Sequence, residues 1–326
     1  MSGHSQDVGP TDGLDRQGDR PDVPVVVALG GNTLLGEHGP WTAEDQLAVV
    51  EQTARQVATV IDAGYEVVLT HGNGPQVGNL MLQQEAAPES PQLPLDVLVA
   101  ETQAQLGYLL QQALDNALDD STDVVTVVTQ TVVEADDPAF DDPTKPVGPR
   151  YTETEAAAKP FETRAVGDGD RPYRRVVPSP EPVALVESEE IAGLVARGNH
   201  VVCAGGGGVP VVRDDDGLRG VEAVVDKDLA SQVLAGDLGA DTLVVLTDVP
   251  YASVNYGDAD ERPLEAVAVE RLREHLAAGE FGAGSMQPKI EACCRFVEAG
   301  GDRAVVTTPD RLTAALAGEA GTQIHR

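Results

Sequence analysis

Lysine is nearly absent from this sequence, and aromatic residues make up only 3% of it. The 326 residues include four lysines, Lys145, Lys159, Lys227 and Lys289, against 54 acidic side chains, so that the net charge is −32. Binding to a nucleic acid backbone requires a basic face, which this charge balance does not supply. The composition therefore argues against nucleic acid as a partner.

Long apolar runs and a disulfide pattern are missing too. No run approaches the ~20 apolar residues of a membrane span, and residues 1–23 lack the basic and apolar regions of a signal peptide and are typical of a disordered acidic tail. The three cysteines, Cys203, Cys293 and Cys294, form neither a disulfide framework nor a spaced metal motif. We therefore expect no membrane partner, reduced cysteines and a cytoplasmic location.

The acidic excess itself has two interpretations. Acidic chains can be disordered, but 41% hydrophobic residues with regular periodicity indicate a folded protein. A carboxylate-covered surface with little lysine suggests adaptation to high salt, where screening removes the self-repulsion of such charge. A merely acidic protein at ordinary salt is the alternative.

Strand and helix patterns alternate along the chain. The segment PVVVALGG, residues 24–31, is an apolar, β-branched run that ends in two glycines. Thr42 with Asp45 forms a capping box for a helix that Gly64 ends. We expect strands over 24–31, 65–70, 123–131, 200–204, 241–247 and 302–308, and further helices over 77–87, 96–118, 183–197, from about 228, and over 289–299. This alternation predicts an α/β fold, with a parallel sheet covered by helices on both faces.

Residues 135–180 interrupt the alternation. This segment is rich in Pro, Asp, Glu and Arg, has almost no apolar period, and contains two of the four lysines. Because a structureless stretch of this length is uncommon inside a compact domain, we interpret it as a small excursion from the main body. A disordered linker is the alternative, but it would not explain Lys145.

Glycine-dense turns follow three of the predicted strands, at 28–32, 70–76 and 203–210. Glycine lets a ligand approach backbone N–H groups closely, and ligands in parallel sheets bind beyond the carboxyl ends of the strands. Each turn alone is more often a simple tight turn, but the three together favour one anion site. Neither dinucleotide-binding nor P-loop glycine patterns occur. His71, in the second turn, is either a base or, as we favour, a brace for the loop.

Lys227 and Lys289 are both expected near helix N-termini, where the helix dipole repels a cation. Such a position is reasonable if an anion such as a phosphate lies between the dipole and the amine. Asp226 and Asp228 flank Lys227, and either carboxylate is able to orient its ammonium group. Solvated surface lysines are the alternative, weakened by the scarcity of lysine. Lys159 has no comparable setting, and we predict that it is a surface residue.

Lysines and glycine loops without a metal-ligand cluster suit phosphoryl transfer, in which the protein mainly positions substrates and neutralises charge. A nucleotide would bring Mg²⁺, bound chiefly by its phosphates. The seven segments VVALGGNTLL, THGNGPQVGNL, PTKPVGP, AGGGGVPVV, GVEAVVDKDLAS, LTDV…VNYG and GSMQPKIEACCRFVEAGG resemble, in this order, those of carbamate kinases in the amino acid kinase superfamily. The resemblance covers roughly residues 24–316.

The resemblance implies reversible phosphoryl transfer between carbamoyl phosphate plus ADP and carbamate plus ATP, with Mg²⁺, in a homodimer. It also implies an open α/β/α sandwich with a mostly parallel central sheet and a small protruding subdomain at about 135–180. An N-terminal lobe over 24–225 would bind carbamate or carbamoyl phosphate, and a C-terminal lobe over 226–326 would bind the nucleotide. ATP formation during arginine fermentation is the direction that the resemblance favours.

Site residues follow from the resemblance, motif by motif. Lys145 would reach from the subdomain onto carbamoyl phosphate, Lys227 and Lys289 would neutralise phosphate charge, and Asp228 would hold the lysines in place. The residues that would cradle the carbamate and the phosphoryl group are Gly30, Gly31, Asn32, Gly72, Asn73 and Gly74. The nucleotide site would include Thr247, Asp248 and Tyr251.

Two departures from the wider superfamily stand out. Ala28 and Leu29 occupy the place before the first glycine pair where many relatives have a lysine, an absence that carbamate kinases share. Ser253 stands where relatives often have tyrosine, which leaves the adenine contacts open. Other functions remain possible on this sequence: a kinase of the same superfamily acting on UMP or acetylglutamate, or a non-catalytic sensor of anions or nucleotides.

Overall fold

A central eight-stranded sheet organises the computed structural model, which describes residues 23–30, 42–282 and 286–326. The strand order is β15-β17-β16-β12-β1-β2-β9-β3, and all pairings are parallel except that of β16 with β17. The strands are β1 (Val25–Leu29), β2 (Val67–His71), β3 (Val124–Thr126), β9 (His200–Cys203), β12 (Thr242–Leu246), β15 (Ala266–Ala268), β16 (Arg303–Thr307) and β17 (Thr322–His325). The predicted α/β fold with a mostly parallel sheet is confirmed.

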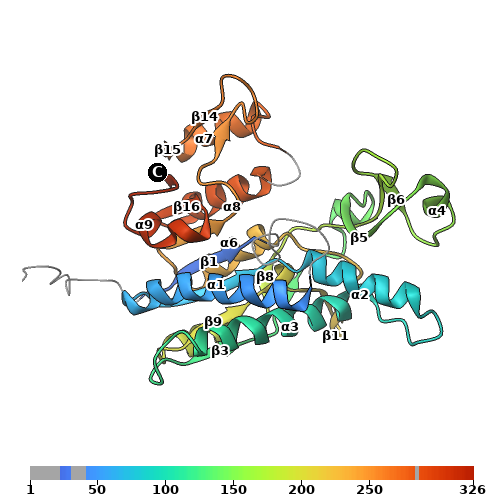
Figure 1. Ribbon diagram of the computed structural model, residues 1–326, viewed down its shortest axis with the longest axis horizontal. Helices are drawn as coiled ribbons and strands as arrows, with labels where there is room; N and C mark the ends of the chain where they lie inside the picture. Colours follow the sequence, from blue (N-terminus) through green and yellow to red (C-terminus); the bar gives the residue numbers. More distant parts are fainter. Residues whose placement is uncertain (1–22, 31–41, 283–285) are drawn as a thin grey trace, which may run out of the picture.

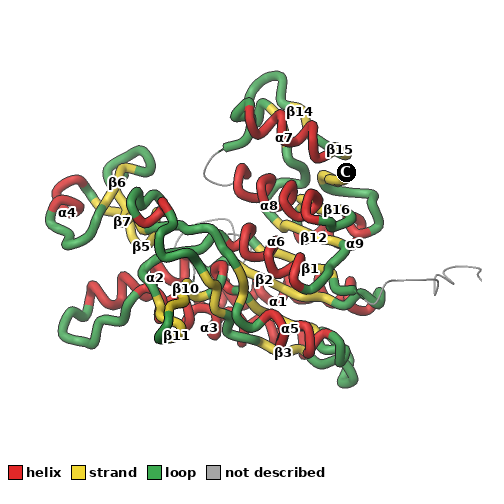
Figure 2. Tube along the Cα trace, turned by 180° about the vertical axis from the view of Figure 1, so that it is seen from behind, coloured by secondary structure: helices red, strands yellow, loops and turns green. Residues whose placement is uncertain are grey.

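Helices cover both faces of this sheet, as its alternating side chains require (Figure 1, Figure 2). In β1, Val27 and Leu29 pack into one core with α1, α3 and α9, whereas Val26 and Ala28 pack into the other with α5, α6, α7 and α8. Successive residues of a strand point to opposite faces, so a strand buried on both sides is apolar throughout. The helices are α1 (Ala43–Asp62), α3 (Leu95–Asp115), α5 (Ser188–Val195), α6 (Lys227–Asp237), α7 (Val269–Ala277), α8 (Met286–Ala299) and α9 (Leu312–Leu316).

The predicted capping box of α1 is confirmed. The Asp45 backbone N–H donates to Thr42 Oγ1 at 3.1 Å, and the Thr42 N–H donates to Asp45 Oδ2 at 2.8 Å. These reciprocal bonds satisfy two N–H groups that a helix start leaves without a partner. At the other end Gly64 takes a φ of 86°, a left-handed conformation that glycine adopts without steric cost.

The prediction of one strand over 123–131 was wrong. Residues 124–126 join the central sheet, and the chain then crosses to a second sheet of order β11-β10-β4-β8. The Val127 N–H still bonds to Val202 O, but Thr129 O accepts from Val209 N–H. Periodicity does not reveal such a change of partner. The strands of the second sheet are β4 (Gln130–Val132), β8 (Ala184–Leu185), β10 (Val209–Asp214) and β11 (Gly217–Gly220).

Two helix starts also differ from the prediction. The helix expected over 183–197 begins at Ser188, because residues 184–185 pair with β4 instead. The helix expected over 289–299 begins at Met286, which places Lys289 within the helix rather than at its first residue. A short antiparallel pair, β13 (Ser253–Val254) with β14 (Arg262–Pro263), was not predicted.

The excursion over 135–180 folds into its own antiparallel sheet and extends away from the central sheet (Figure 1). Its strands are β5 (Lys145–Tyr151), β7 (Tyr173–Val177) and β6 (Thr163–Ala165), in this spatial order, with the short helix α4 (Glu153–Ala157). Val147 and Val177 pack against Val77 and Met81 of α2 (Gly74–Ala86). The protruding subdomain is thus ordered and seated on the main body. The division into lobes at residue 225 stays a prediction.

Lys159, predicted to be a surface residue, is partly exposed but also makes structural contacts. It is half-buried, its Nζ lies 2.8 Å from Glu85 Oε2 on α2, and it stands 4.3 Å from the centroid of the Tyr151 ring. The Tyr151 hydroxyl donates to the other oxygen of Glu85. This cluster ties the protruding subdomain to α2, so the lysine has a structural role.

All three cysteines are buried with free thiols, in β9 and α8 as predicted. Within the described ranges, no helix combines the length and apolar character needed to cross a membrane.

Candidate functional site

A cavity of about 1110 Å³ lies where the strands of the central sheet end. Gly30 follows β1, Gly72 follows β2, Gly206 follows β9 and Thr247 follows β12, and all four line it. Carboxyl ends of parallel strands meet at one edge, so turns that are distant in sequence converge there. The convergence of the three predicted glycine turns is therefore observed.

The glycine turns fit closely against one another. The Gly72 N–H donates to Leu29 O at 3.1 Å, which holds the second turn against the end of β1. Asn73 donates through Nδ2 to Thr102 Oγ1 at 2.9 Å. Gly206, with φ 66°, packs on the Asn73 amide so closely that a Cβ would lie 2.2 Å from its Oδ1. Gly206 therefore has no room for a side chain, and its approach fixes the Asn73 side chain.

Three helices begin at the cavity. Gly74, Lys227 and Gln287 stand at or near the first residues of α2, α6 and α8, and each lines the cavity. Helix N-termini carry partial positive charge and unpaired N–H groups, which favour bound anions. Of the six residues predicted to cradle substrate, Gly30, Gly72, Asn73 and Gly74 meet here. Gly31 and Asn32 lie outside the described residues.

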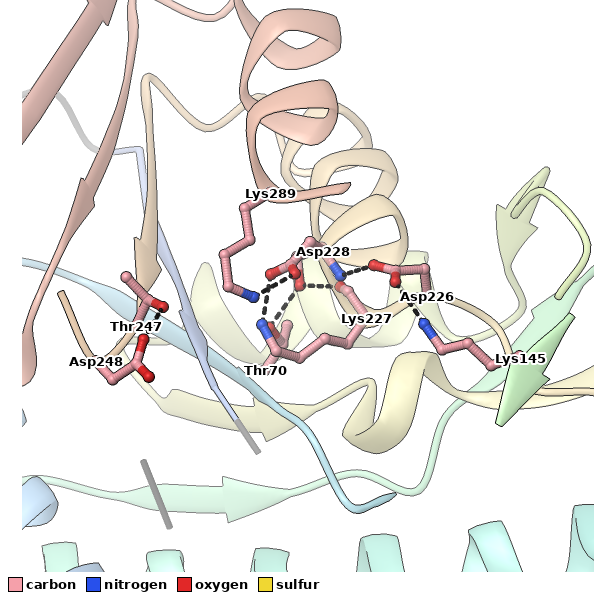
Figure 3. A network of polar contacts seen from close by, with 9 residues as sticks. Thr70, Lys145, Asp226, Lys227, Asp228, Thr247, Asp248 and Lys289 are labelled. Carbon is pink, nitrogen blue, oxygen red and sulfur yellow. Dashed lines mark hydrogen bonds and ion pairs between the residues drawn. The ribbon is translucent and has the colours of Figure 1, made fainter. Parts of the chain in front are cut away.

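Asp228 joins the two predicted phosphate-binding lysines (Figure 3). Its Oδ1 accepts from Lys227 Nζ, and its Oδ2 lies 3.0 Å from Lys289 Nζ. The carboxylate is 3% exposed and the two lysine side chains 11% and 12%. Burial lowers the pKa of Lys227, whereas the charge of Asp228 opposes that change. One carboxylate shared by two ammonium groups leaves an excess positive charge, which a bound anion would neutralise.

Lys145 reaches the same cavity from the protruding subdomain. Its Nζ lies 2.8 Å from Asp226 Oδ2, and Asp226 also accepts from the Asp228 N–H at 2.9 Å as the N-cap of α6. Burial alone would raise the pKa of Asp226, but Lys145 and Lys227 lower it, so the carboxylate is charged. The two aspartates thus divide the lysines between them: Asp226 binds Lys145, and Asp228 binds the other two.

The predicted nucleotide residues are only partly brought together. Thr247 and Asp248 line the cavity, and Thr247 Oγ1 donates to Asp248 Oδ1 at 3.0 Å. Tyr251 is not among the lining residues; its ring lies 5.8 Å from the Arg311 guanidinium carbon instead. Its part in nucleotide binding stays a prediction. Ser253 is buried in β13, away from this lining.

His71 is buried at the end of β2, where its Nδ1 lies 3.2 Å from Gly72 O. Burial lowers its pKa to about 4; the hydrogen bond with Gly72 opposes this change, and the charge of Lys227 adds to it. A Cβ on Gly205 would lie 2.5 Å from the ring, so the imidazole fills the space between two glycine turns. This setting favours the interpretation of His71 as a brace.

Two arginines of the cavity were not predicted. Arg295, on α8, donates to Glu181 Oε2 at 2.6 Å and to Glu291 Oε1 at 2.6 Å, which links α8 to the chain leaving the subdomain. Arg174, on β7, also lines the cavity. The sequence did give a signal for Arg174, because residues 135–180, which include Lys145, are rich in arginine. The local sequence does not, however, indicate which side chains of β7 face the cavity.

The described protein side chains of this site offer too few ligands to hold a metal ion without a bound substrate. Among the described residues, no three His, Cys, Asp or Glu side chains group closely enough to hold a metal ion. Asp226, Asp228, Glu181 and Glu291 of the lining are already paired with cations. Of the described lining carboxylates, Asp248 alone has no such partner, and it is exposed. One carboxylate fits Mg²⁺, which commonly binds nucleotide phosphates and few protein ligands.

Comparison with known proteins identifies the family to which this chain belongs. The profile of the amino acid kinase family matches residues 24–308, most of the chain. The chain belongs to the amino acid kinase family. Within this family, a carbamate kinase of Halobacterium salinarum is 54% identical over 92% of the chain and 97% of that relative. One of Thermococcus kodakarensis is 48% identical over 93% and 99%.

A solved structure agrees with the amino acid kinase assignment. The carbamate kinase of Giardia lamblia bound to AMP-PNP superimposes with a TM-score of 0.87 at 42% identity, over 93% of this chain and 98% of that one. The protruding subdomain and the cavity at the strand ends therefore belong to an enzyme fold with kinase relatives across nearly its whole length.

Proposed function

We propose that this amino acid kinase catalyses reversible phosphoryl transfer between carbamoyl phosphate plus ADP and carbamate plus ATP. The observation that carries the proposal is the buried pair Lys227 and Lys289, which share one carboxylate at the edge where three helices begin. The 54% identity to a carbamate kinase supports the choice of substrate.

The chain's own residues would act by positioning and by neutralising charge. In the direction of ATP formation, a β-phosphate oxygen of ADP attacks the phosphorus of carbamoyl phosphate, the bond from that phosphorus to the carbamate oxygen breaks, and carbamate leaves with the electron pair. Both reactants are anions, so the main barrier is to bring them together. The excess positive charge at Asp228, Lys227 and Lys289 would reduce this repulsion and stabilise the charge of the transferring group.

A general base is dispensable in this scheme, because both the phosphate and the carbamate oxygens attack as anions. The neutral, buried His71 is consistent with that requirement. The N–H group of Gly74, at the start of α2, would bind an oxygen of the smaller substrate. Mg²⁺ would offset the charge of the nucleotide phosphates, with Asp248 as the protein group available to it.

The test is ATP formation from purified protein, carbamoyl phosphate, ADP and Mg²⁺, measured by a coupled assay. UMP and acetylglutamate, each offered with ATP, serve as competing acceptors. ATP formation from carbamoyl phosphate with no turnover of the other two supports the proposal. Turnover of either alternative instead would assign a different kinase, and absence of all turnover would favour a sensor.

The proposal extends to assembly, location, physiological direction and salt adaptation. We propose a homodimer, from the family resemblance, which light scattering after size exclusion would test. A cytoplasmic location is proposed because the cysteines have free thiols. ATP formation in arginine fermentation is proposed from the resemblance. Adaptation to high salt is proposed from the charge of −32, and the similarity to a protein of Halobacterium salinarum supports it.

A further inference from the structure

Among the described residues, five cationic side chains line the cavity, and their partners differ. Four of them, Lys145, Lys227, Lys289 and Arg295, each form an ion pair with an aspartate or glutamate. Within the described ranges, Arg174 forms no ion pair, although the chain carries 54 acidic residues. In such an acidic protein, a cavity cation without a carboxylate partner requires an explanation.

Arg174 is held in place by the segment that also carries Lys145. Its Nε donates to Gly148 O at 3.1 Å. Gly148 has φ 70°, at a bulge where the pairing of β5 with β7 shifts register, and a Cβ there would lie 2.9 Å from Met81 Cε. The glycine lets its carbonyl turn toward the guanidinium. One nitrogen of Arg174 thus fixes the side chain, and its two terminal nitrogens have no hydrogen-bond acceptor in the described residues.

The electrostatic setting of Arg174 also favours an anion. The side chain is half-buried, and burial lowers its pKa, with a further contribution from the charge of Arg150. A half-buried guanidinium beside another cation is disfavoured unless a counter-charge arrives. Because guanidinium presents two parallel N–H donors, it matches the oxygen pairs of phosphate and carboxylate groups.

The position of Arg174 indicates which of the two substrates it would bind. Lys145 and Arg174 lie on the paired strands β5 and β7 of the protruding subdomain. Thr247 and Asp248, predicted to bind the nucleotide, lie across the Lys227–Lys289 pair from Lys145 (Figure 3). A group carried by the subdomain is thus on the side of the smaller substrate.

We propose that Arg174 is a further substrate-binding residue, whose terminal guanidinium nitrogens bind the phosphate of carbamoyl phosphate together with Lys145. The proposal rests on the proposed function, since it assigns this substrate. The proposal also gives a role to Gly148, in the TKPVGP segment. Its carbonyl orients Arg174 to bind beside Lys145, which belongs to the same segment.

The experiment compares Arg174→Gln with Arg175→Gln. Arg175 is the next residue of β7, but its NH2 pairs with Glu222 Oε2 at 2.6 Å, and it is absent from the cavity lining. Loss of a charged hydrogen bond is typically worth a factor of about 10 to 100 in binding. For Arg174→Gln we expect the KM for carbamoyl phosphate to rise by about that factor, with the KM for ADP within about twofold of wild type. Arg175→Gln should leave both unchanged.

A conservative variant separates charge from geometry. Arg174→Lys keeps the charge and loses the paired donors, so its KM for carbamoyl phosphate should lie between those of wild type and Arg174→Gln. Equal increases in both KM values, or a change in kcat alone, would overturn the assignment to this substrate. Melting temperatures of the variants show whether each remains folded.

Inorganic phosphate binding, measured by calorimetry without nucleotide, distinguishes failure of this inference from failure of the proposed function. If wild type makes no ATP but binds phosphate, and Arg174→Gln binds it at least about tenfold more weakly, the proposed reaction fails while the anion site stands. If wild type makes ATP and Arg174→Gln matches it in both assays, the inference fails alone. If wild type neither makes ATP nor binds phosphate, both are overturned.

Discussion

Half of the four lysines of this chain meet at Asp228, whose carboxylate is almost fully buried. Buried ammonium groups need a counter-charge, and this carboxylate supplies only one for two. This incomplete neutralisation favours an anion, and the proposed function assigns that anion as a phosphate. The neighbouring Asp226 is fully used as a helix cap and as the partner of Lys145.

Replacement of Lys289 by alanine should lower turnover by about 10²–10³-fold, because a donor aimed at transition-state charge is worth about 2.7–4 kcal/mol. A coupled assay at saturating substrates measures it. Arg55→Ala is the control: this exposed arginine of α1 pairs with Glu51 outside the cavity, and its loss should leave turnover within about twofold of wild type. Equal turnover in both variants would reject the role of Lys289.

The lowered pKa of His71 predicts how the stability of the protein depends on pH. The folded protein holds its pKa at about 4 by burial, below the ordinary 6.5, so the unfolded chain binds the proton more tightly. The neutral ring therefore contributes stability that is complete above pH 6.5 and is lost as the pH falls toward 4. The loss amounts to about 3 kcal/mol.

Denaturant unfolding of wild type and His71→Asn at several pH values between 7 and 4 gives the free energy of unfolding at each pH. The contribution of His71 is the difference between the two proteins in how steeply this free energy falls with decreasing pH. Other buried groups, such as His200, whose pKa burial also lowers, affect both proteins equally. Parallel curves for the two proteins would refute the contribution of His71. If the variant does not fold, the imidazole of wild type, followed by NMR, should remain neutral down to about pH 5.

At the scale of elements, the glycine turns and the helix starts are built as one unit. Gly206, in the turn after β9, packs on Asn73, which precedes α2, and Asn73 in turn bonds to Thr102 of α3. A substitution in one turn should therefore displace residues of the neighbouring turn.

Gly206→Ala should disturb this unit, because the added Cβ overlaps the Asn73 amide and the φ of 66° disfavours any side chain. We expect loss of at least 2 kcal/mol of unfolding free energy, about the scale of overpacking plus backbone strain, with a rise in KM for carbamoyl phosphate. Gly236→Ala in α6 is the control, since a Cβ there meets nothing within 4 Å. It should raise stability by up to about 1 kcal/mol, because alanine favours helix. Urea unfolding decides between these outcomes, and equal effects would contradict the packing argument.

At the scale of the whole molecule, the charge of −32 is the dominant property. Several ion pairs among the described residues, such as that of Arg271 with Glu274, are exposed on both sides and therefore offset little of this charge. Self-repulsion of this size destabilises a compact state unless salt screens it.

We therefore expect the melting temperature to rise strongly between about 0.1 M and 2 M KCl, over which the screening length falls from ~10 Å to a few Å. A neutral osmolyte such as sucrose, at matched osmolality, is the control: it should raise the melting temperature much less. A melting temperature independent of KCl would contradict adaptation to high salt.

Local chemistry was sufficient to predict much of this protein. The apolar runs predicted buried strands, Thr42 and Asp45 predicted a helix start, and the resemblance of seven motifs named the lysines. These features depend on neighbours in sequence, where periodicity, capping and turn chemistry act.

Only the tertiary structure decided which distant groups meet. Asp228 and Lys289 are 61 positions apart, and Lys145 and Asp226 are 81 apart. Their contacts depend on strand order and on how the protruding subdomain sits, as does the orientation of Arg174 toward the cavity. The break of the strand at 127 has the same cause, because a backbone pairs with whichever sheet offers hydrogen bonds at that point. The sequence by itself determined the elements and the chemical groups, while the packing of those elements determined the charge that the site presents to a substrate.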